Sequence, residues 1–489
     1  MLRERVVSPA EFRARTLGAI AAAVALALQP ATSRAATQQE LEARVQALAD
    51  QLQEVQAELA ELKQEKQQNP GPPAAARNAQ VPPGAGALPP GTSALPPGSV
   101  ASGTAAPGST ARSHAAPAAP SNATTAGQVS YGSQFQSQAA GRNGPNFFGY
   151  GELTYDRPSG RPEDSQVDLA RFVLGTGYQF DDRTRFVSEL EIEHAVSSAE
   201  DPGEVEIEQA YIERDLSPGI FARAGLILIP SGMLNENHEP TRYYGVFRNF
   251  IETAIIPSTW REGGVALQGT TDSGLRWDAG LTTGFDLSKW DATSTDGQES
   301  PLGSIHQELA LARARDVSGF AALNYTGIPG LRAGGSVFTG GASQGRPGLP
   351  SSQVTLWEGH FRWTPGDWDF AGLYARGHIS GTRQFNSTLV GNPSLVPQSF
   401  FGWYLQAAYR LFDTDVTSLT PFLRYERFNT AASYADVGPG LTPGVLPDRR
   451  VWTAGINWMF APGVVFKVDY LDFQGGEGDR FGVGLGYQF

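Results

Sequence analysis

The stretch FGVGLGYQF, residues 481–489, is the most informative part of this sequence. Apolar or aromatic residues stand at every second position, and glycine or glutamine stands between them. Strict alternation is the pattern of a β-strand with one apolar face and one small or polar face. The stretch therefore predicts a strand whose apolar face ends on Phe489.

The same alternation recurs upstream. In VWTAGINWMF, residues 451–460, one face carries Trp452, Ala454, Ile456, Trp458 and Phe460. In 185–193 we expect Phe186, Leu190 and Ile192 to face outward, and Glu189, Glu191 and Glu193 to face inward. In 354–363 the aromatic residues alternate with Glu358, His360 and Arg362. Many aromatic residues stand near strand ends, which fits the interfacial girdles of membrane barrels.

Turn residues and polar stretches separate these strands in a regular order. Seven short turns are marked by Asp, Pro and Gly at 181–182, 217–219, 272–274, 329–330, 365–367, 413–415 and 462–463. Eight longer polar stretches lie at 157–165, 196–204, 230–260, 285–316, 340–352, 381–399, 430–449 and 474–479. The alternation predicts 16 antiparallel strands with both barrel ends on one side; merging one weak hairpin would give 14.

The start of the chain predicts export. Residues 1–35 have the pattern of a signal peptide: four arginines before residue 16, the apolar run LGAIAAAVALAL (17–28), and Ser33 and Ala35 before a cleavage site. A short N-terminal anchor is the alternative. After residue 35 no segment approaches 18 uninterrupted apolar residues, so a membrane-embedded mature chain must be a closed β-barrel. The stretch 481–489 resembles the last strand of bacterial outer-membrane barrels, which implies that the barrel assembly machinery reads Phe489.

Composition narrows the function classes. The net charge of −13 argues against a nucleic-acid partner, which needs a basic surface. The absence of cysteine excludes lipidation, disulfides and thiolate chemistry. We expect the protein in the outer membrane of a Gram-negative cell, in contact with its lipid and with its N-terminal segment in the periplasm.

Residues 37–68 predict a coiled-coil helix. Apolar residues recur there with spacings of four and three: Leu41, Val45, Leu48, Leu52, Val55, Leu59 and Leu62. A single such helix is marginal in water, so we expect self-association into a homotrimer, by analogy with outer-membrane porins. Packing of the helix on its own barrel is the alternative. Dimer and trimer are not distinguished by the sequence.

Residues 69–145 are rich in Pro, Ala, Gly and Ser and predict a disordered linker. Pro-Pro-Gly recurs at 82–84, 89–91 and 96–98, with a period of seven that excludes collagen. The barrel then occupies 147–489. A tether between envelope layers is a second role open to residues 37–145.

The segment IPSGMLNENHEPTRYYGVFRNFIETAIIPSTW, residues 229–260, is the predicted constriction loop of the pore. A solvent-exposed loop does not need Phe247, Phe250, Ile251, Ile255 and Ile256, so we expect it to fold back inside the wall; a surface lid is the alternative. Its charged residues would then reach the lumen and create a transverse field: Glu236, His238, Glu239, Arg242, Arg248 and Glu252.

The runs 168–195 and 205–239 resemble the phosphate-selective porin O and P family. The resemblance rests on the arginine-containing strand, the Asp-Asp turn and the AYIE…SPG…ARAG hairpin before an inward-folding loop. The coiled coil resembles the arrangement in related trimeric organic-anion channels. The resemblance implies a trimer with a lumenal arginine ladder that guides anions.

By alternation, eight arginines can point inward. They are Arg171, Arg185, Arg223, Arg276, Arg332, Arg362, Arg410 and Arg424. The glutamates Glu189, Glu191, Glu193, Glu206 and Glu208 face the same lumen, and Lys289 and Lys467 are the only lysines of the barrel segment. A mixed wall predicts weak anion preference, with passage of small anionic or neutral solutes.

We expect no enzyme, cofactor or metal. The six histidines are His114, His194, His238, His306, His360 and His378, and none shows HExxH spacing; no GxSxG elbow is present either. No DxDxDG-type loop supports Ca²⁺. A trimeric adhesin is a further rival, but its barrel segment per chain would be shorter.

Overall fold

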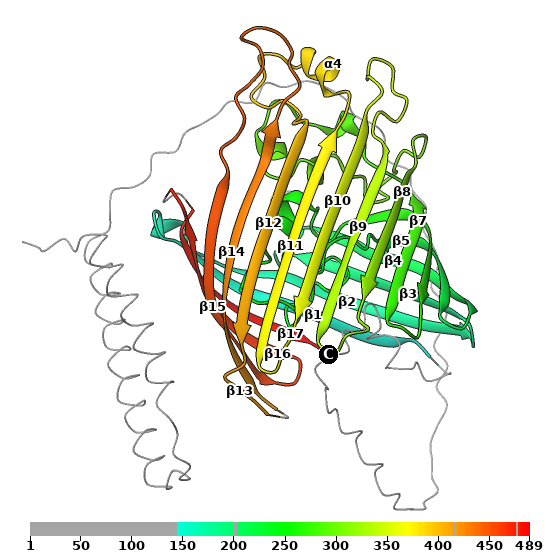
Figure 1. The fold of residues 1–489 in the computed structure, drawn as a ribbon, viewed down its shortest axis with the longest axis vertical. Helices are drawn as coiled ribbons and strands as arrows, with labels where there is room; N and C mark the ends of the chain where they lie inside the picture. Colours follow the sequence, from blue (N-terminus) through cyan, green and yellow to red (C-terminus); the bar gives the residue numbers. More distant parts are fainter. Residues whose placement is uncertain (1–143, 199–200, 202, 415, 476–477) are drawn as a thin grey trace, which may run out of the picture. The chain divides into compact units, whose positions relative to one another are not determined.

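The structure, a computed structural model, describes residues 144–198, 201, 203–414, 416–475 and 478–489. These residues form one closed antiparallel sheet in which each strand pairs with its neighbours in the chain (Figure 1). The two-residue strand β13 continues the line of β12 beside β14, and β12 also pairs with β14 directly. The wall therefore has 16 strands, as the turn pattern predicts.

The strands are β1 (Asn146–Pro158), β2 (Gln166–Asp181), β3 (Thr184–Glu193), β4 (Val205–Ser217), β5 (Ile220–Leu228), β6 (Arg261–Thr270), β7 (Leu275–Thr282), β8 (Ser318–Tyr325), β9 (Leu331–Gly341), β10 (Gln353–Trp363), β11 (Trp368–Ile379), β12 (Ser399–Tyr409), β13 (Phe412–Asp413), β14 (Ser418–Ser433), β15 (Arg449–Ala461), β16 (Val464–Phe473) and β17 (Arg480–Gln488). Short helical turns are η1 (Pro162–Asp164), η2 (Ile251–Ile255), η3 (Leu287–Lys289), η4 (Asp296–Gln298), η5 (Gly303–Ile305) and α4 (Thr382–Ser387).

The first and last strands close the barrel. β1 pairs with β17 in antiparallel register, with Leu153 opposite Leu485. The backbone N–H of Phe489 donates to the Gly149 carbonyl at 2.9 Å, and the Gly149 N–H donates to the Phe489 carbonyl at 3.1 Å. Closure leaves no edge strand with unpaired backbone groups.

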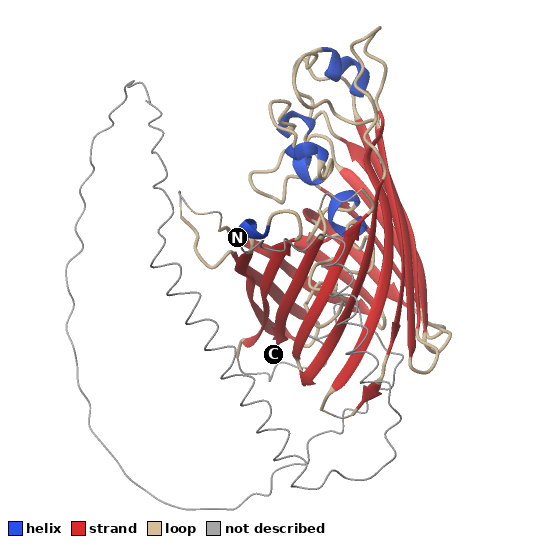
Figure 2. Cartoon of the chain, turned by 90° about the vertical axis from the view of Figure 1, so that its left-hand side faces the viewer, coloured by secondary structure: helices blue, strands red, loops and turns tan. Residues whose placement is uncertain are grey.

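The connections divide by length between the two ends of the barrel. All seven predicted short turns join strands, and each predicted long stretch is a connection at the opposite end. Figure 2 shows most of the helical turns gathered with the long connections beyond one end of the strands. The predicted signal peptide and coiled-coil helix, with almost all of the predicted linker, fall in residues 1–143, outside the described residues.

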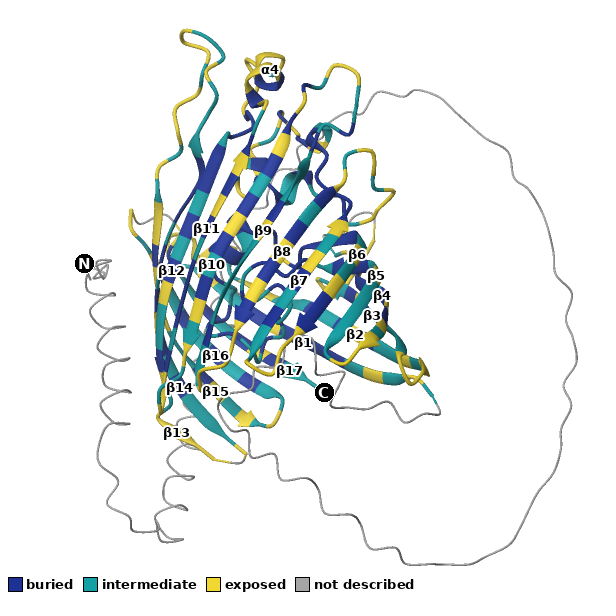
Figure 3. Cartoon of the chain, turned by 45° about the vertical axis from the view of Figure 1, so that its right-hand side comes forward, coloured by how far each residue is buried: buried dark blue, intermediate teal, exposed yellow. Residues whose placement is uncertain are grey.

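The two faces of the wall differ in chemistry. Along β10, Trp357 and Trp363 are exposed on the outside, whereas Glu358 and His360 are buried inside. The same alternation is confirmed in β3 and β15, and Figure 3 shows buried and exposed residues alternating along the strands. Within the described residues, no helix has the length and apolar character needed to cross a membrane.

Part of the interior is an apolar core. Inward-facing residues of β8 to β12, such as Phe338 and Phe400, are buried against Ile251 and Ile255 of η2 and Trp260 beside it. The connection between β7 and β8 contributes further buried side chains, which are Phe285, Leu287, Trp290, Ala292, Leu302 and Ile305. The interior therefore combines an apolar half with a charged one, which strand alternation alone does not reveal.

The glycines of β17 are explained by this inward packing. Gly482, Gly484 and Gly486 are buried on the inner face of the strand. A Cβ atom at Gly486 would lie 2.5 Å from Pro240 Cβ, and one at Gly484 would lie 3.3 Å from a methyl group of Val246. The segment 229–260 can approach β17 only because these positions lack side chains.

We predict that Gly486→Leu destabilises the folded barrel by about 1–3 kcal/mol, because the new side chain overpacks the contact with Pro240. The measurement is the temperature at which the folded, fast-migrating species is lost on semi-native gels. Leu485→Val, on the outer face of the same strand, is the control and should change that temperature less. Equal behaviour of the two variants would contradict the close approach of the loop to β17.

Candidate functional site

The segment 229–260 lies inside the barrel and is bound to strands all around it. The Tyr243 hydroxyl donates to Glu152 of β1 at 2.8 Å, and the Tyr244 hydroxyl donates to Asp369 of β11 at 3.0 Å. The backbone N–H of Val246 donates to Asp469 of β16 at 2.7 Å. The structure thus places the predicted constriction loop across the interior rather than over its mouth.

Glu252 holds this loop together. Its buried carboxylate accepts the backbone N–H of Leu234 at 2.7 Å and that of Met233, and it also accepts the Asn249 amide at 2.7 Å and the Tyr404 hydroxyl at 3.2 Å. Burial raises the pKa of the Glu252 carboxyl above its ordinary value, against the lowering effect of these hydrogen bonds. The expectation that Glu252 reaches the lumen is wrong, because its carboxylate is bonded to backbone N–H groups of the loop itself.

Glu236 joins the loop to the charged half of the wall. It accepts two hydrogen bonds from Arg276 of β7, at 2.8 and 3.0 Å, and lies 3.8 Å from Arg223 of β5. Arg276 is also paired with Asp278 at 2.9 Å. Two arginines and two carboxylates therefore form a buried network between loop and wall.

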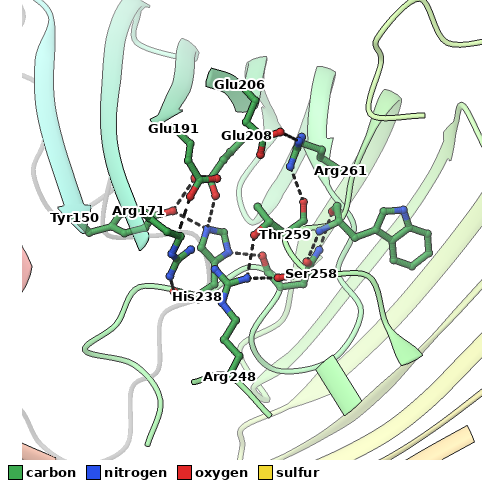
Figure 4. Close-up of polar contacts among 12 residues, drawn as sticks. Tyr150, Arg171, Glu191, Glu206, Glu208, His238, Arg248, Ser258, Thr259 and Arg261 are labelled. Carbon is green, nitrogen blue, oxygen red and sulfur yellow. Dashed lines mark hydrogen bonds and ion pairs between the residues drawn. The ribbon is translucent and has the colours of Figure 1, made fainter. Parts of the chain in front are cut away.

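His238 is the centre of a second polar cluster (Figure 4). Its Nε2 atom lies 2.7 Å from the Tyr150 hydroxyl and 3.4 Å from Glu208 Oε1, and its Nδ1 atom lies 2.9 Å from the Asn235 carbonyl. Arg171 of β2 donates to the His238 carbonyl at 2.7 Å. The cluster connects the loop to β1, β2 and β4.

Arg248 has a different environment from the other arginines named above. Its guanidinium donates to the hydroxyls of Ser258 at 2.5 Å and Thr259 at 2.9 Å. Among the ion pairs of the described residues, none joins Arg248 to a carboxylate within 4.0 Å. Arg242 and Glu239 are half-buried in the same loop. Arg248 is thus a cation held by neutral groups beside the charged half of the interior.

The predicted pore-lining residues of the wall lie on its inner face, and six of its arginines have an acidic partner there. Arg332 of β9 is buried on the same face. The pairs are Arg171–Glu152 at 2.9 Å, Arg185–Asp215 at 3.3 Å, Arg223–Glu213 at 2.5 Å, Arg276–Asp278 at 2.9 Å, Arg362–Asp369 at 2.6 Å and Arg424–Glu426 at 2.8 Å. Arg185 is also bonded to Glu213, and Glu189 and Glu191 are buried on the inner face of β3. These six arginines therefore form a set of ion pairs and not a column of free cations.

Two further cations of the sequence have distinct places. Arg410 lies after the end of β12 and pairs with Asp413 at 2.5 Å, so it belongs to the turn end of the barrel and not to the wall ladder. Lys467 of β16 is buried inside, with its Nζ atom 3.6 Å from the Tyr243 ring centroid. The expectation that Arg410 points into the lumen with the others is wrong for this reason.

Sequence reasoning missed the partners that organise the site. Tyr150, Glu152 and Asp369 are inward-facing strand residues that hold the loop. The one sequence signal for them is that they occupy the inward positions of alternating strands. Alternation predicts that Glu208 faces the lumen, but it does not predict the bulge at which Glu208 stands. The β3–β4 ladder shifts register beside it, pairing Glu189 with Gln209 and Leu190 with Ile207, so Glu208 is the extra residue of a β-bulge.

Comparison with known proteins gives one relative and a group of barrels. No protein-family model matches the chain. It is 32% identical over 351 residues to an uncharacterized protein of Aquifex aeolicus (strain VF5), a match that covers 68% of this chain and 76% of that protein.

Among solved structures, Salmonella typhi OmpF in complex with daunomycin is similar, with a TM-score of 0.50 and 14% identity, over 71% of this chain and 97% of that one. The channel DcaP of Acinetobacter baumannii has a TM-score of 0.45 and 13% identity, over 71% and 97%. An anion-selective porin from Comamonas acidovorans has a TM-score of 0.44 and 12% identity, over 71% and 99%. At these identities the likeness to OmpF is one of fold.

We predict that Glu252→Ala loosens the loop and lowers the free energy of unfolding by about 2–4 kcal/mol, because it leaves several buried donors without an acceptor. Denaturant unfolding of the purified protein, followed by tryptophan fluorescence, measures this change. Glu252→Gln keeps one acceptor oxygen and should cost less. If Ala and Gln are equally mild, Glu252 does not hold the loop.

Proposed function

We propose that this chain, which belongs to the same family as the Aquifex aeolicus protein, is an outer-membrane porin that lets small hydrophilic solutes diffuse through its barrel. The main support is the difference in chemistry between the outer and inner faces of the barrel wall. A closed 16-stranded sheet has apolar and aromatic side chains outside and paired charges inside. Barrels of this strand number are wide enough for an aqueous channel.

The outer face supports a position in a lipid bilayer. Exposed aromatic residues gather near the short-turn end of the strands, and they are Phe180, Tyr325, Trp363, Trp368, Tyr409, Phe412, Trp458 and Phe460. Aromatic side chains of this kind favour the interface between the acyl chains and the head groups. By the usual asymmetry of such barrels, the short turns face the periplasm and the long connections face outward.

The paired arginines support weak anion preference. An arginine within hydrogen-bond distance of a carboxylate contributes little net field to a passing solute, since the two charges nearly cancel at a distance. Arg248, held by hydroxyls, keeps its full charge and is the residue that we assign to anion attraction. The resemblance of residues 168–239 to the phosphate-selective porin O and P family favours phosphate or small organic anions as solutes.

We also propose that the functional unit is a homotrimer assembled through the heptad residues 41–62. A trimer places three barrels side by side, and a coiled coil of three helices supplies the apolar partners that one helix lacks. Insertion through the barrel assembly machinery, with Phe489 as its signal, completes the proposal.

The channel is tested by conductance across a planar lipid bilayer that holds the purified protein in a KCl gradient. We expect a stable conductance with a reversal potential on the anion side. A reversal potential on the cation side would keep the channel but assign selectivity to the inward glutamates. No conductance from folded, heat-modifiable protein would reject the porin.

We predict that Arg248→Gln shifts the reversal potential toward cation preference, because it removes a loop cation that is held by neutral hydroxyl groups. Arg427→Gln is the matched control: it removes the same charge from β14, but Arg427 lies on the outward-facing side of the strand and is paired with Asp448. The control should leave the reversal potential unchanged. An unchanged value in both variants would remove Arg248 from the selectivity region.

A further inference from the structure

The cluster around His238 contains a set of side chains suited to a metal ion. Glu189 of β3, Glu208 of β4 and His238 of the loop each offer one ligand atom, and these atoms lie within 4.8 Å of one another. The three residues are 5%, 0% and 4% exposed. Ligands bound to one ion at about 2.1 Å are about 3–4.2 Å apart, so a small inward movement would complete the site.

Glu208 supplies an independent sign of a missing ligand. Its Oε1 atom is enclosed and has no hydrogen-bond partner, and it faces His238 Nε2 at 3.4 Å. Tyr150 offers one O–H to two acceptors, Glu208 Oε2 at 2.6 Å and His238 Nε2 at 2.7 Å. Among Tyr150, Glu208 and His238 with its Nδ1–H engaged, three acceptor atoms therefore face a single O–H donor. A buried acceptor without a partner is costly.

The charges of the cluster do not balance. Arg171 is engaged by Glu152 at 2.9 Å and lies 4.0 Å from Glu191. Within the described part of the chain, neither Glu189 nor Glu208 has an arginine or lysine within ion-pair distance. Buried carboxylates need a cation or a proton, since an isolated buried charge is unstable.

The imidazole of His238 is oriented for metal binding. Because the Asn235 carbonyl can only accept, the Nδ1–H of His238 is the donor of that 2.9 Å hydrogen bond. In the neutral ring, Nε2 then carries the lone pair and points into the cluster. A backbone carbonyl that fixes the tautomer through the other nitrogen is the usual support of a metal-bound histidine.

The β-bulge explains how two neighbouring strands deliver their carboxylates to one point. Before the bulge, Glu206 and Glu208 face inward; after it, Gln209 and Tyr211 do. The extra residue therefore brings Glu208 into the interior beside Glu189, while the loop brings His238 from the other side. HExxH-type spacing is absent because the ligands come from two strands and a loop.

We propose that Glu189, Glu208 and His238 bind a divalent transition-metal cation such as Zn²⁺ or Mn²⁺. Two carboxylate oxygens and one imidazole nitrogen suit these ions, whereas Ca²⁺ and Mg²⁺ prefer oxygen ligands throughout. The bound ion neutralises the two glutamates and joins the loop 229–260 to β3 and β4. The sequence-based expectation of no metal is revised by this proposal, which does not depend on channel activity.

The test is Mn²⁺ binding to the purified, folded full chain without a polyhistidine tag, after treatment with a chelator. Electron paramagnetic resonance should detect one bound Mn²⁺ per chain, displaced by ZnCl₂ but not by an equal concentration of CaCl₂. Glu208→Gln, which keeps the side-chain shape and an acceptor for Tyr150, should weaken binding at least about tenfold. His238→Gln should do the same.

The matched control is His360→Gln. His360 is also buried on the inner wall, with its Nδ1 atom 2.8 Å from Glu358 Oε2. Within the described residues, it belongs to no group of three side chains that could hold a metal ion. This variant should keep Mn²⁺ affinity. Folding of each variant is checked by its heat-modifiable mobility. Absence of Mn²⁺ and Zn²⁺ binding by folded wild-type protein, equal loss in His360→Gln, or full affinity in Glu208→Gln would overturn the proposal in favour of a proton-filled cluster.

Discussion

The backbone hydrogen bonds of this barrel run around a closed circle of strands, and the arrangement of the interior follows from that closure. In hydrocarbon an unpaired N–H or C=O group costs several kcal/mol, so a membrane wall made of strands must have no edge. Here the circle is completed by β1 and β17, through the pairing of Gly149 with Phe489 and the register that follows. In the closed barrel, alternate side chains of every strand face inward. The positions of the loop contacts and of the charge clusters follow from this alternation.

The loop segment 229–260 fills much of the interior and packs against the inner faces of the strands. Residues 229–260 pack Ile251, Ile255 and Trp260 against the apolar inner faces of β8 to β12, and they present Glu236, His238 and Arg248 toward the charged half. The glycines of β17 permit the close approach of this loop on the other side. The loop thus lies inside the barrel and is held there by buried packing and hydrogen bonds.

Charge pairing gives this barrel a different electrostatic character from a column of free arginines. Six arginines of the predicted wall set (Arg171, Arg185, Arg223, Arg276, Arg362 and Arg424) are matched by a carboxylate on a neighbouring strand or on their own strand. The pairs are strong enough locally to fix side-chain positions, yet they cancel over longer distances. In contrast, the cluster at Glu189, Glu208 and His238 has a buried carboxylate oxygen without a hydrogen-bond partner. This cluster can therefore attract a cation, whereas the ion pairs of the wall are already neutralised.

Local residue periodicity and turn chemistry were enough to predict the turns, the long connections, the face of each clearly alternating strand and a wall of 16 strands, with 14 as the alternative. The sequence also indicated the inward loop, because large apolar residues such as Phe250 and Ile251 favour burial over exposure to solvent. The pairing of acids with arginines, the role of Glu252 in holding the loop and the bulge that brings Glu208 to His238 became visible in the folded barrel. Apart from the same-strand pairs Arg276–Asp278 and Arg424–Glu426, these contacts join different strands and loops or separate parts of the loop 229–260. Their positions depend on barrel closure and on inter-strand register, which no local pattern encodes.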